Sequence, residues 1–434
     1  MTPSSNERQF REFLARKISG VYWGLWFLVP EHLRLGSWDL LKSWSAGDDR
    51  SIDARLALQM VHESALCVSG IRPVRSLCHQ GFEVLNGLSF IATDKTIHQL
   101  LDSHTIVQAQ YLQIALAKLR RESGHYQGQI FAFDPHRINT YSKRIMPAKK
   151  ANPKSPSQKV FQTFFVIDAQ TGQPILFASG SPGAKTSKTS LKLFDMLEDV
   201  FPQGGLAVAD TEHASVEILN HILADSKFEI LMPMAKNQKI KRIMADLEYE
   251  RKWAGYALAK TSYQFTGMGE SVNLIIQRTG EREEEFRYQP FVSTFIDDMV
   301  KMLTEEYPER WTIEEFFNFE AAMGWDKART MNLNIRYGKM TMALIAQAVC
   351  YQFRQKLPKP YKQWTAKHLA DSIFRGIDGD LRVKNDTIIV TLYNVPEELN
   401  LRKHYENLPE KLEKEGFDPK VPWLYNFKLD FRFK

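Results

Sequence analysis

The stretch Gln129-Ile-Phe-Ala-Phe-Asp134 opens the part of the chain that decides the fold. It is a short apolar run that ends at an acidic residue. After a basic segment, residues 160–167 are rich in β-branched and aromatic side chains, residues 168–172 supply a turn, and residues 174–178 have the pattern of a return strand. We therefore predict three strands close together, the last two of them joined as a hairpin.

Helices and strands alternate after this hairpin. Residues 187–201 carry apolar side chains at steps of three and four, which predicts an amphipathic helix. An apolar run over 205–209 ends at Asp210, and a helical pattern over 216–223 precedes a fifth strand at 228–232. The order β-β-β-α-β-α-β is that of an RNase H-like fold, a mixed α/β class in which strands one and four are neighbours. Asp134 and Asp210 are therefore expected to lie close together.

A third acidic candidate lies far downstream, in Tyr307-Pro-Glu-Arg310-Trp-Thr-Ile-Glu314-Glu315-Phe-Phe. On an α-helix, Tyr307, Arg310 and Glu314 share one face, where they can hold a phosphate and a metal ion together. The adjacent Glu315 points about 100° away on such a helix, so the stripe favours Glu314. The alternative is that Arg310 forms an ordinary surface ion pair with Glu306 or Glu314.

Three carboxylates delivered by two strands and a helix indicate metal-dependent chemistry on a phosphodiester. Mg²⁺ and Mn²⁺ prefer hard oxygen ligands, and two such ions about 3.5–4 Å apart activate the attacking oxygen and stabilise the leaving one. We assign Asp134 as the bridging ligand, Asp210 as a ligand of one ion and Glu314 as a ligand of the other. A single Asp at a strand end is usually a cap or turn residue, so the assignment depends on all three together with the element order.

Basic residues follow two of the predicted strands. Residues 135–159 contain no Asp or Glu but hold Arg137, Lys143, Arg144, Lys149, Lys150, Lys154 and Lys159. A second cluster follows the fifth strand and comprises Lys236, Lys239, Lys241 and Arg242. One Lys-rich loop is usually a solvated surface, but two beside candidate acidic residues favour contact with DNA phosphates. The formal net charge of +6 permits nucleic-acid binding without requiring it.

Residues 243–290 form a β-rich insertion before the helix of Glu314, and residues 291–295 return to the core. Trp253 lies in this insertion, where it either stacks on an unpaired or flipped base or fills the core of the insertion.

The other regions complete the predicted domain organisation. Residues 1–125 form a helical domain, either a DNA-binding domain or a bundle packed on the core; helical patterns cover 52–68, 93–101 and 106–119. The catalytic core comprises residues 126–242 and 291–355. Residues 356–434 contain a hairpin at 381–392 whose role the sequence does not indicate.

Localisation rests on weaker features of the sequence. Cys67, Cys78 and Cys350 match neither a metal-site spacing nor a disulfide framework, which indicates a reducing compartment. No signal peptide is visible, and the apolar run 21–29 is too short to cross a bilayer. We expect a cytoplasmic, nucleoid-associated protein without membrane contact.

The pattern Tyr307-x-x-Arg310-x-x-x-Glu314 resembles the Y-R-E signature of bacterial DDE insertion-sequence transposases of the cut-and-paste type. Residues 131–134 and 208–217 resemble the first and second Asp motifs of that family, and the resemblance covers about residues 125–355. It implies an RNase H-like core with a β insertion and Mg²⁺-dependent cleavage at transposon ends, often through a hairpin intermediate. It also implies strand transfer into double-stranded target DNA by a 3′-hydroxyl and a homodimer on paired ends.

One position departs from the family pattern. The family often has a Lys seven positions after the Glu, where this chain has Ala321. The departure puts one contact with the DNA end in doubt and leaves the metal ligands unaffected. Two alternatives stay open: an RNase H-like nuclease that cuts without joining, and a domesticated DNA-binding protein without catalysis.

Overall fold

A computed structural model describes residues 4–68, 81–140, 143, 148–150, 156–180, 185–326 and 330–434. Its contacts divide the chain into two compact units, one of Met1–Ser123 with Phe317–Lys434 and the other of Gly124–Phe316. This division groups residues 317–434 with the N-terminal helices and keeps the expected insertion, residues 243–290, in one unit with the core. The four domain ranges stay a prediction.

The unit Gly124–Phe316 is mixed α/β and contains the predicted strands and helices in their predicted order, with an unpredicted short strand after the first and an unpredicted helix after the fifth. They are β2 (Ile130–Asn139), β3 (Ala148–Lys150), β4 (Ser157–Asp168), β5 (Gln173–Gly180), α9 (Thr186–Val200), β6 (Gly205–Ala209), η2 (Thr211–His213), α10 (Val216–Asp225), β7 (Phe228–Pro233), α11 (Gln238–Asp246), β8 (Glu250–Trp253), β9 (Tyr256–Tyr263), β10 (Val272–Thr279), η3 (Glu283–Glu285), β11 (Arg287–Ser293), α12 (Met299–Lys301), η4 (Met302–Glu306), η5 (Tyr307–Trp311) and the first turn of α13 (Thr312–Glu320).

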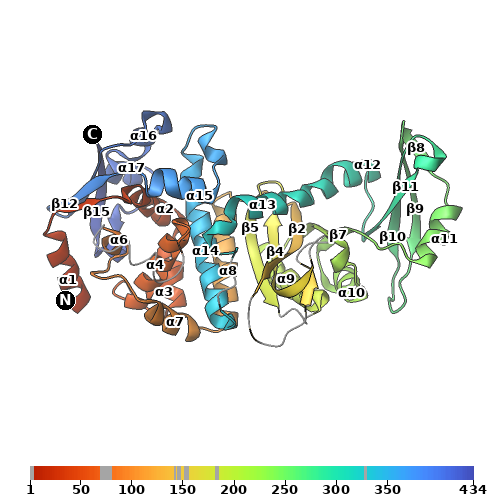
Figure 1. Ribbon diagram of the computed structural model, residues 1–434, viewed down its shortest axis with the longest axis horizontal. Helices are drawn as coiled ribbons and strands as arrows, with labels where there is room; N and C mark the ends of the chain where they lie inside the picture. The colour runs from red at the N-terminus through yellow and green to blue at the C-terminus, as the bar shows by residue number, and fades with distance from the viewer. Residues whose placement is uncertain are drawn as a thin grey trace. The chain divides into compact units, whose positions relative to one another are not determined.

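The central sheet has the strand order β5-β4-β2-β6-β7. Strands β2, β6 and β7 are parallel, whereas β4 is antiparallel to both β2 and β5. Helices α9 and α10 lie on one side of this sheet and α13 on the other (Figure 1). Phe133 stacks on Phe194 of α9 at 4.6 Å, and Phe165 contacts Phe316 of α13 at 6.0 Å. This arrangement confirms the predicted RNase H-like core, with strands one and four side by side.

Strand β2 is longer than the sequence indicated. It continues through Asp134 to Asn139, paired with β4 as far as Val160. The prediction that Asp134 ends its strand is therefore wrong, and the first part of the basic segment is strand rather than loop. The physical reason is that β4 extends equally far, so the backbone of β2 beyond Asp134 finds hydrogen-bond partners whatever its side chains are.

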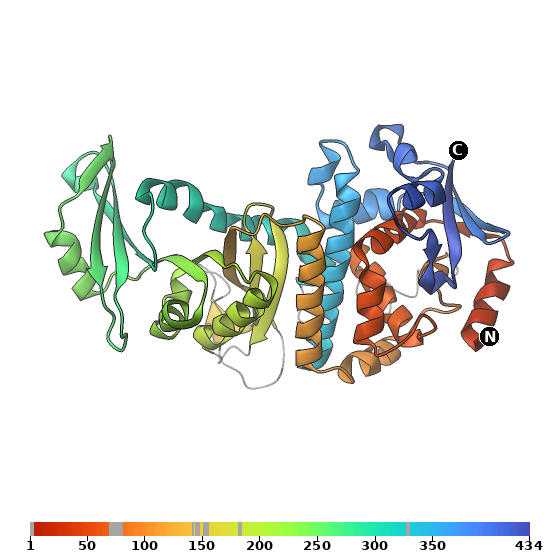
Figure 2. The same cartoon turned by 180° about the vertical axis from the view of Figure 1, so that it is seen from behind.

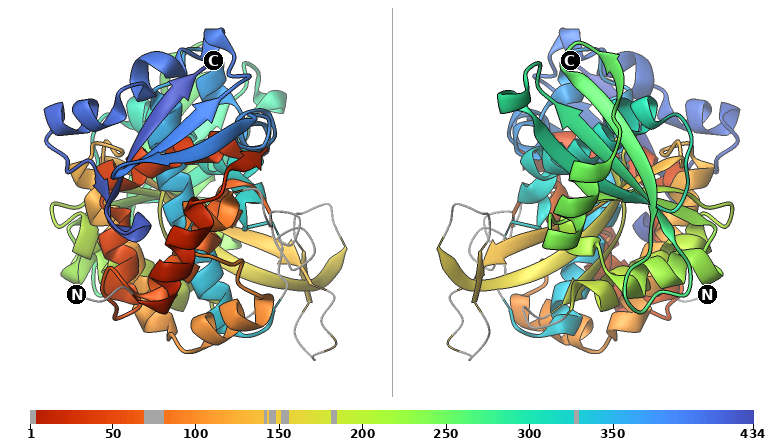
Figure 3. Two further views of the ribbon diagram at one scale, coloured as in Figure 1. Left: turned by 90° about the vertical axis from the view of Figure 1, so that its left-hand side faces the viewer. Right: turned by 90° about the vertical axis from the view of Figure 1, so that its right-hand side faces the viewer.

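The insertion continues the central sheet. Strands β8, β9, β10 and β11 pair in antiparallel succession, and β11 pairs with β7 through Phe291↔Pro233 and Ser293↔Leu231. The predicted β-rich insertion and the return of the chain at residue 291 are thus both observed. The right-hand view of Figure 3 shows these strands in front.

The unit that contains both termini is built around α14. Its elements are α1 (Ser5–Leu14), β1 (Ile18–Gly20), η1 (Trp23–Phe27), α2 (Leu28–Leu35), α3 (Ser37–Trp44), α4 (Ile52–Ala65), α6 (Phe82–Leu85), α7 (Asp94–Asp102), α8 (Ile106–Glu122), the end of α13, η6 (Ala321–Met323), α14 (Leu333–Gln355), η7 (Tyr361–Gln363), α15 (Ala366–Leu369), η8 (Ala370–Phe374), β12 (Gly379–Lys384), β13 (Thr387–Leu392), η9 (Glu397–Leu399), α16 (Leu401–Tyr405), α17 (Leu408–Lys414), β14 (Lys420–Val421), η10 (Pro422–Leu424) and β15 (Phe427–Phe433).

Helix α14 packs against α4 and α8, and Figure 2 shows α8 beside it. The predicted hairpin is observed as β12 and β13, within a sheet of order β1-β12-β13-β15-β14. Cys67 and Cys350 are free thiols, and Cys78 lies outside the described residues. Over the part of the chain that the structure describes, every helix is too short or too polar to cross a membrane.

Candidate active site

The first two acidic candidates come from adjacent parallel strands. The ladder between β2 and β6 ends at the pair Phe133↔Ala209, and Asp134 and Asp210 are the next residues. Neighbouring strands lie about 4.8 Å apart, so the backbones of the two residues are close. Asp210 caps the turn η2 by accepting a hydrogen bond of 2.6 Å from the Thr211 backbone N–H.

Asp134 lies in the most perturbed environment of the site. Its side chain is 20% exposed, and burial raises its pKa to about 7. Arg310 opposes this rise, whereas the negative charges of Asp210, Glu314 and Glu212 add to it. All three predicted carboxylates therefore interact electrostatically at one place, together with a fourth that the sequence did not identify.

The segment that carries Arg310 differs from the continuous α-helix predicted. It passes from a π-helical turn, η4, through a 3₁₀ turn, η5, into α13. Tyr307 and Arg310 lie in η5, where residues three apart are eclipsed, so they still share a face. Burial raises the pKa of the Tyr307 hydroxyl and the nearby Arg310 guanidinium opposes that rise, while the Tyr307 ring packs edge-on against Phe291 at 5.0 Å.

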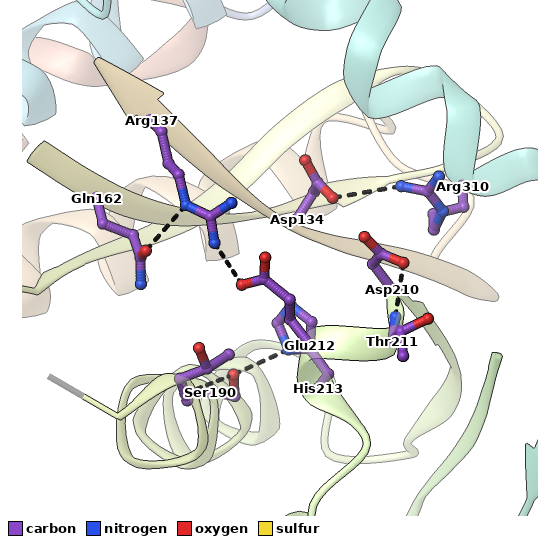
Figure 4. A network of polar contacts seen from close by, with 10 residues as sticks. Asp134, Arg137, Gln162, Ser190, Asp210, Thr211, Glu212, His213 and Arg310 are labelled. Carbon is purple, nitrogen blue, oxygen red and sulfur yellow. Dashed lines mark hydrogen bonds and ion pairs between the residues drawn. The ribbon is translucent and has the colours of Figure 1, made fainter. Parts of the chain in front are cut away.

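Arg310 connects two of the predicted ligands. It donates a hydrogen bond of 3.3 Å to the Asp134 carboxylate (Figure 4) and forms an ion pair of 3.8 Å with Glu314. The ordinary ion pair considered for Arg310 is thus present, but the contact with Asp134 joins it to the core. The guanidinium places positive charge between carboxylates from β2 and α13.

The carboxylates suit a divalent metal ion in their chemistry. Asp134, Asp210 and Glu314 offer hard oxygen donors of the kind that Mg²⁺ and Mn²⁺ prefer. In this structure Arg310 contacts two of these carboxylates, Asp134 and Glu314. Among the described residues, no three His, Cys, Asp or Glu side chains lie close enough together to hold a metal ion. Burial is the main cause of the raised pKa of Asp134, and the negative charges of Asp210, Glu314 and Glu212 add to it; a bound cation would oppose that repulsion.

Helix α13 is seated by buried side chains and presents its carboxylates outward. Ile313 and Phe316 are buried, while the Glu314 side chain is 48% exposed and Glu315 is also exposed. Trp311, by contrast, is 57% exposed beside Arg310, with 5.3 Å between its ring centre and the guanidinium carbon.

One comparison with known protein families matches this part of the chain. Residues 125–348, more than half of the chain, match the family described as "Transposase DDE domain". The chain belongs to this family. Members of the DDE transposase family are nucleic-acid-cleaving or transposing enzymes that generally use divalent metal ions.

Two further comparisons concern curated sequences and solved structures. No curated protein sequence matches the chain. A solved structure of the piggyBac transposase synaptic complex with hairpin DNA is similar to it, at 12% identity and a TM-score of 0.43, over 94% of this chain and 84% of that one.

A second polar network of this DDE domain lies beside Asp210 (Figure 4). Arg137 on β2 donates one hydrogen bond of 3.1 Å to Gln162 of β4 and forms an ion pair with Glu212 of η2. His213 is buried, and burial lowers its pKa to about 4, so its ring is neutral; its Nδ1 lies 3.0 Å from the Ser190 hydroxyl. Sequence reasoning missed Glu212, although its place two residues after Asp210 was a signal.

The remaining basic candidates of the DDE domain are on the surface where they are described. Lys143, Lys236 and Lys239 are exposed, and the Lys239 ammonium lies 4.7 Å from the centre of the Tyr263 ring. Lys241 and Arg242 are exposed on α11. Arg144 and Lys154 lie outside the described residues.

Trp253 lies at the end of β8 and is 48% exposed. One face of its ring stacks on Tyr256, with centroids 4.3 Å apart and planes within 5°. Both side chains line an open cavity of about 270 Å³ that Arg278 and Phe286 also border. The exposure of Trp253 favours the surface role over the insertion-core alternative, and its outer face is available for a planar group.

Proposed function

We propose that this protein is a DNA transposase of the Y-R-E type that cuts at transposon ends and joins a 3′-hydroxyl to target DNA. The observation that carries the proposal is the family match over residues 125–348, since that range contains Asp134, Asp210 and Glu314 and the strand pairing that makes the first two neighbours.

The carboxylates have separate roles in the proposed reaction. Asp134 would be the ligand shared by two Mg²⁺ or Mn²⁺ ions, Asp210 would hold one of these ions and Glu314 the other. Bound ions would supply activation of the attacking oxygen and stabilisation of the leaving oxygen. Arg310 exchanges its carboxylate partners for a phosphate of the DNA, because its planar guanidinium matches both, and Tyr307 keeps it oriented.

The exposed groups around this site are proposed to hold DNA. The proposed phosphate contacts come from four basic residues, Lys143, Arg144, Lys236 and Lys239. Each ion pair with a phosphate releases counterions from the DNA, which favours binding. Two exposed indoles add stacking platforms: Trp311 beside Arg310, and Trp253 on the insertion, where an unpaired or flipped base of a hairpin intermediate would fit.

Other features follow the family expectation. The proposed partners are double-stranded transposon ends and target DNA, bound by a homodimer that pairs two ends. A bacterial insertion-sequence origin and a nucleoid-associated cytoplasmic location belong to the same proposal. The N-terminal range 1–125 is proposed as a domain that helps bind the ends.

Joining of pre-cut ends tests the proposal. Fragments with the terminal repeats that flank the gene, ending in a free 3′-hydroxyl, are incubated with a target plasmid and Mg²⁺ or Mn²⁺. We expect joined products, and cleavage without joining would instead establish the nuclease alternative. Binding of the ends without cleavage or joining would establish the non-catalytic alternative.

Two adjacent glutamates provide a matched pair for the metal site. Glu314→Gln should abolish cleavage and joining while end binding in EDTA persists, and Glu315→Gln should retain both activities. The reverse result would move the third ligand by one residue.

A further inference from the structure

The position of Asp210 is not set by the sheet alone. Backbone pairing between β2 and β6 stops at Ala209, one residue before Asp210. From there the chain enters the short turn η2, Thr211–His213. A side-chain contact that anchors this turn to β2 therefore also sets the distance between Asp210 and Asp134.

Arg137 makes that connection. It lies on β2, three residues after Asp134, directly opposite the fully buried Gln162 of β4. Its Nε donates to the Gln162 side-chain oxygen, and its terminal nitrogen pairs with Glu212, the middle residue of η2. One guanidinium thus links β2, β4 and the turn (Figure 4).

The other side of the turn is held by His213. Its ring is 1% exposed, contacts the Ser190 hydroxyl of α9, and packs edge-on against Phe164 and Phe133 at 5.9 and 6.3 Å. The turn that follows Asp210 therefore has one anchor to the strands and one to α9. A turn of three residues fixed at both later positions leaves the Asp210 backbone little freedom.

We propose that Arg137 and Glu212 are positioning residues that hold Asp210 at the distance from Asp134 required for metal binding. The inference rests on the proposed function of these two carboxylates. Arg137 touches neither of them, and Glu212 acts through Arg137 rather than as a ligand. In metalloproteins, removal of a residue that orients a metal ligand without binding the metal itself lowers metal affinity or activity by about 10–100-fold.

The direction in which metal affinity changes when Arg137 is removed distinguishes a positioning role from a purely electrostatic one. Arg137 is a cation near a cation site, so its removal should strengthen metal binding if only long-range Coulomb forces mattered. Positioning predicts the opposite, because a freed turn must be ordered again when the metal binds. Arg137→Gln is therefore the decisive variant, while Glu212→Gln weakens binding on either account.

Mn²⁺ affinity of the full-length protein without DNA, measured by electron paramagnetic resonance titration, is the test. We expect Arg137→Gln and Glu212→Gln each to weaken Mn²⁺ binding about tenfold. Arg137→Lys, which keeps the charge and one donor, should recover part of the loss. Arg282→Gln, which removes an exposed arginine of the same unit, should match the wild type.

Several outcomes would overturn the inference. Unchanged or tighter Mn²⁺ binding by Arg137→Gln would exclude positioning, and a loss confined to Glu212→Gln would then show that Glu212 acts through its negative charge and not through Arg137. Unchanged metal binding with weaker binding of end DNA by Arg137→Gln would return Arg137 to the DNA contacts predicted from sequence. If Arg137→Gln does not fold, Arg137→Lys and Glu212→Asp carry the test. Failure of the wild type to bind Mn²⁺ would instead refute the proposed function.

Discussion

Replacing Asp134 with asparagine should stabilise the metal-free protein at neutral and alkaline pH while it removes a ligand of the proposed metal site. The folded environment raises the pKa of Asp134 from its ordinary value of 3.8 to about 7, mainly through burial. The difference, at 1.36 kcal/mol per pKa unit, amounts to about 4 kcal/mol of unfavourable free energy above pH 7. The asparagine side chain has nearly the same shape and keeps an oxygen for Arg310, but it carries no charge to desolvate.

The pH dependence has a defined sign. The pKa of Asp134 is higher in the folded state than in the unfolded state. Below about pH 4 its carboxyl group is protonated in both states, so it does not change the free energy of unfolding there. Between pH 4 and 7 the folded state binds more protons than the unfolded state, so the stability of the wild type falls as the pH rises. The advantage of Asp134→Asn should accordingly grow from near zero at pH 4 to its full value at pH 8.

Thermal unfolding in EDTA at several pH values is the assay. For a unit the size of Gly124–Phe316, each kcal/mol shifts the midpoint by about 2–4 °C, so the shift at pH 8 should reach about 8–16 °C at most. Asp246→Asn, on the exposed side of α11, should show no shift. Mg²⁺ at pH 8 should stabilise the wild type and leave Asp134→Asn unchanged. Equal midpoints of the wild type and Asp134→Asn at pH 8 would refute the reasoning.

Three further predictions concern other parts of the structure. Arg310→Ala removes a guanidinium that lowers the Asp134 pKa, so that pKa should rise above 7; a carboxyl titration by NMR that finds it lowered would contradict this. Trp253→Ala should weaken binding of hairpin-ended DNA by about 1–3 kcal/mol in fluorescence anisotropy and leave Mn²⁺ affinity intact, whereas equal loss on blunt duplex would argue against base stacking. Phe165→Ala, at a fully buried position between β5 and α13, should destabilise its unit by about 3–5 kcal/mol in urea unfolding, and a loss below about 1 kcal/mol would question the packing.

The sequence predicted the strand order because each strand carries its own apolar pattern between turn signals. It also identified Asp134 and Asp210 as neighbours, since that follows from the order alone. It did not predict that β2 extends past Asp134, because the extension depends on how far β4 reaches, and no local pattern records the length of a partner strand.

Two features of the segment that carries Glu314 were also not predicted from the sequence. Pro308 has no N–H to donate, which disfavours a continuous α-helix there, and the chain passes through π and 3₁₀ turns instead. This signal was present in the sequence but was outweighed by the regular spacing of Tyr307, Arg310 and Glu314. The exposure of Trp311 depends on how η5 packs on the sheet, and therefore on tertiary contacts that periodicity does not contain.

The central claim is that Asp134, Asp210 and Glu314 converge on divalent metal ions. Anomalous scattering from a crystal soaked in Mn²⁺ at pH 8, with end DNA bound, tests it most directly. We predict two Mn²⁺ peaks, one ligated by Asp134 and Asp210 and the other by Asp134 and Glu314, with Arg310 turned to a DNA phosphate. Peaks ligated by Glu212 or Glu315, or Arg310 still bound to Asp134 with no metal beside it, would contradict the account.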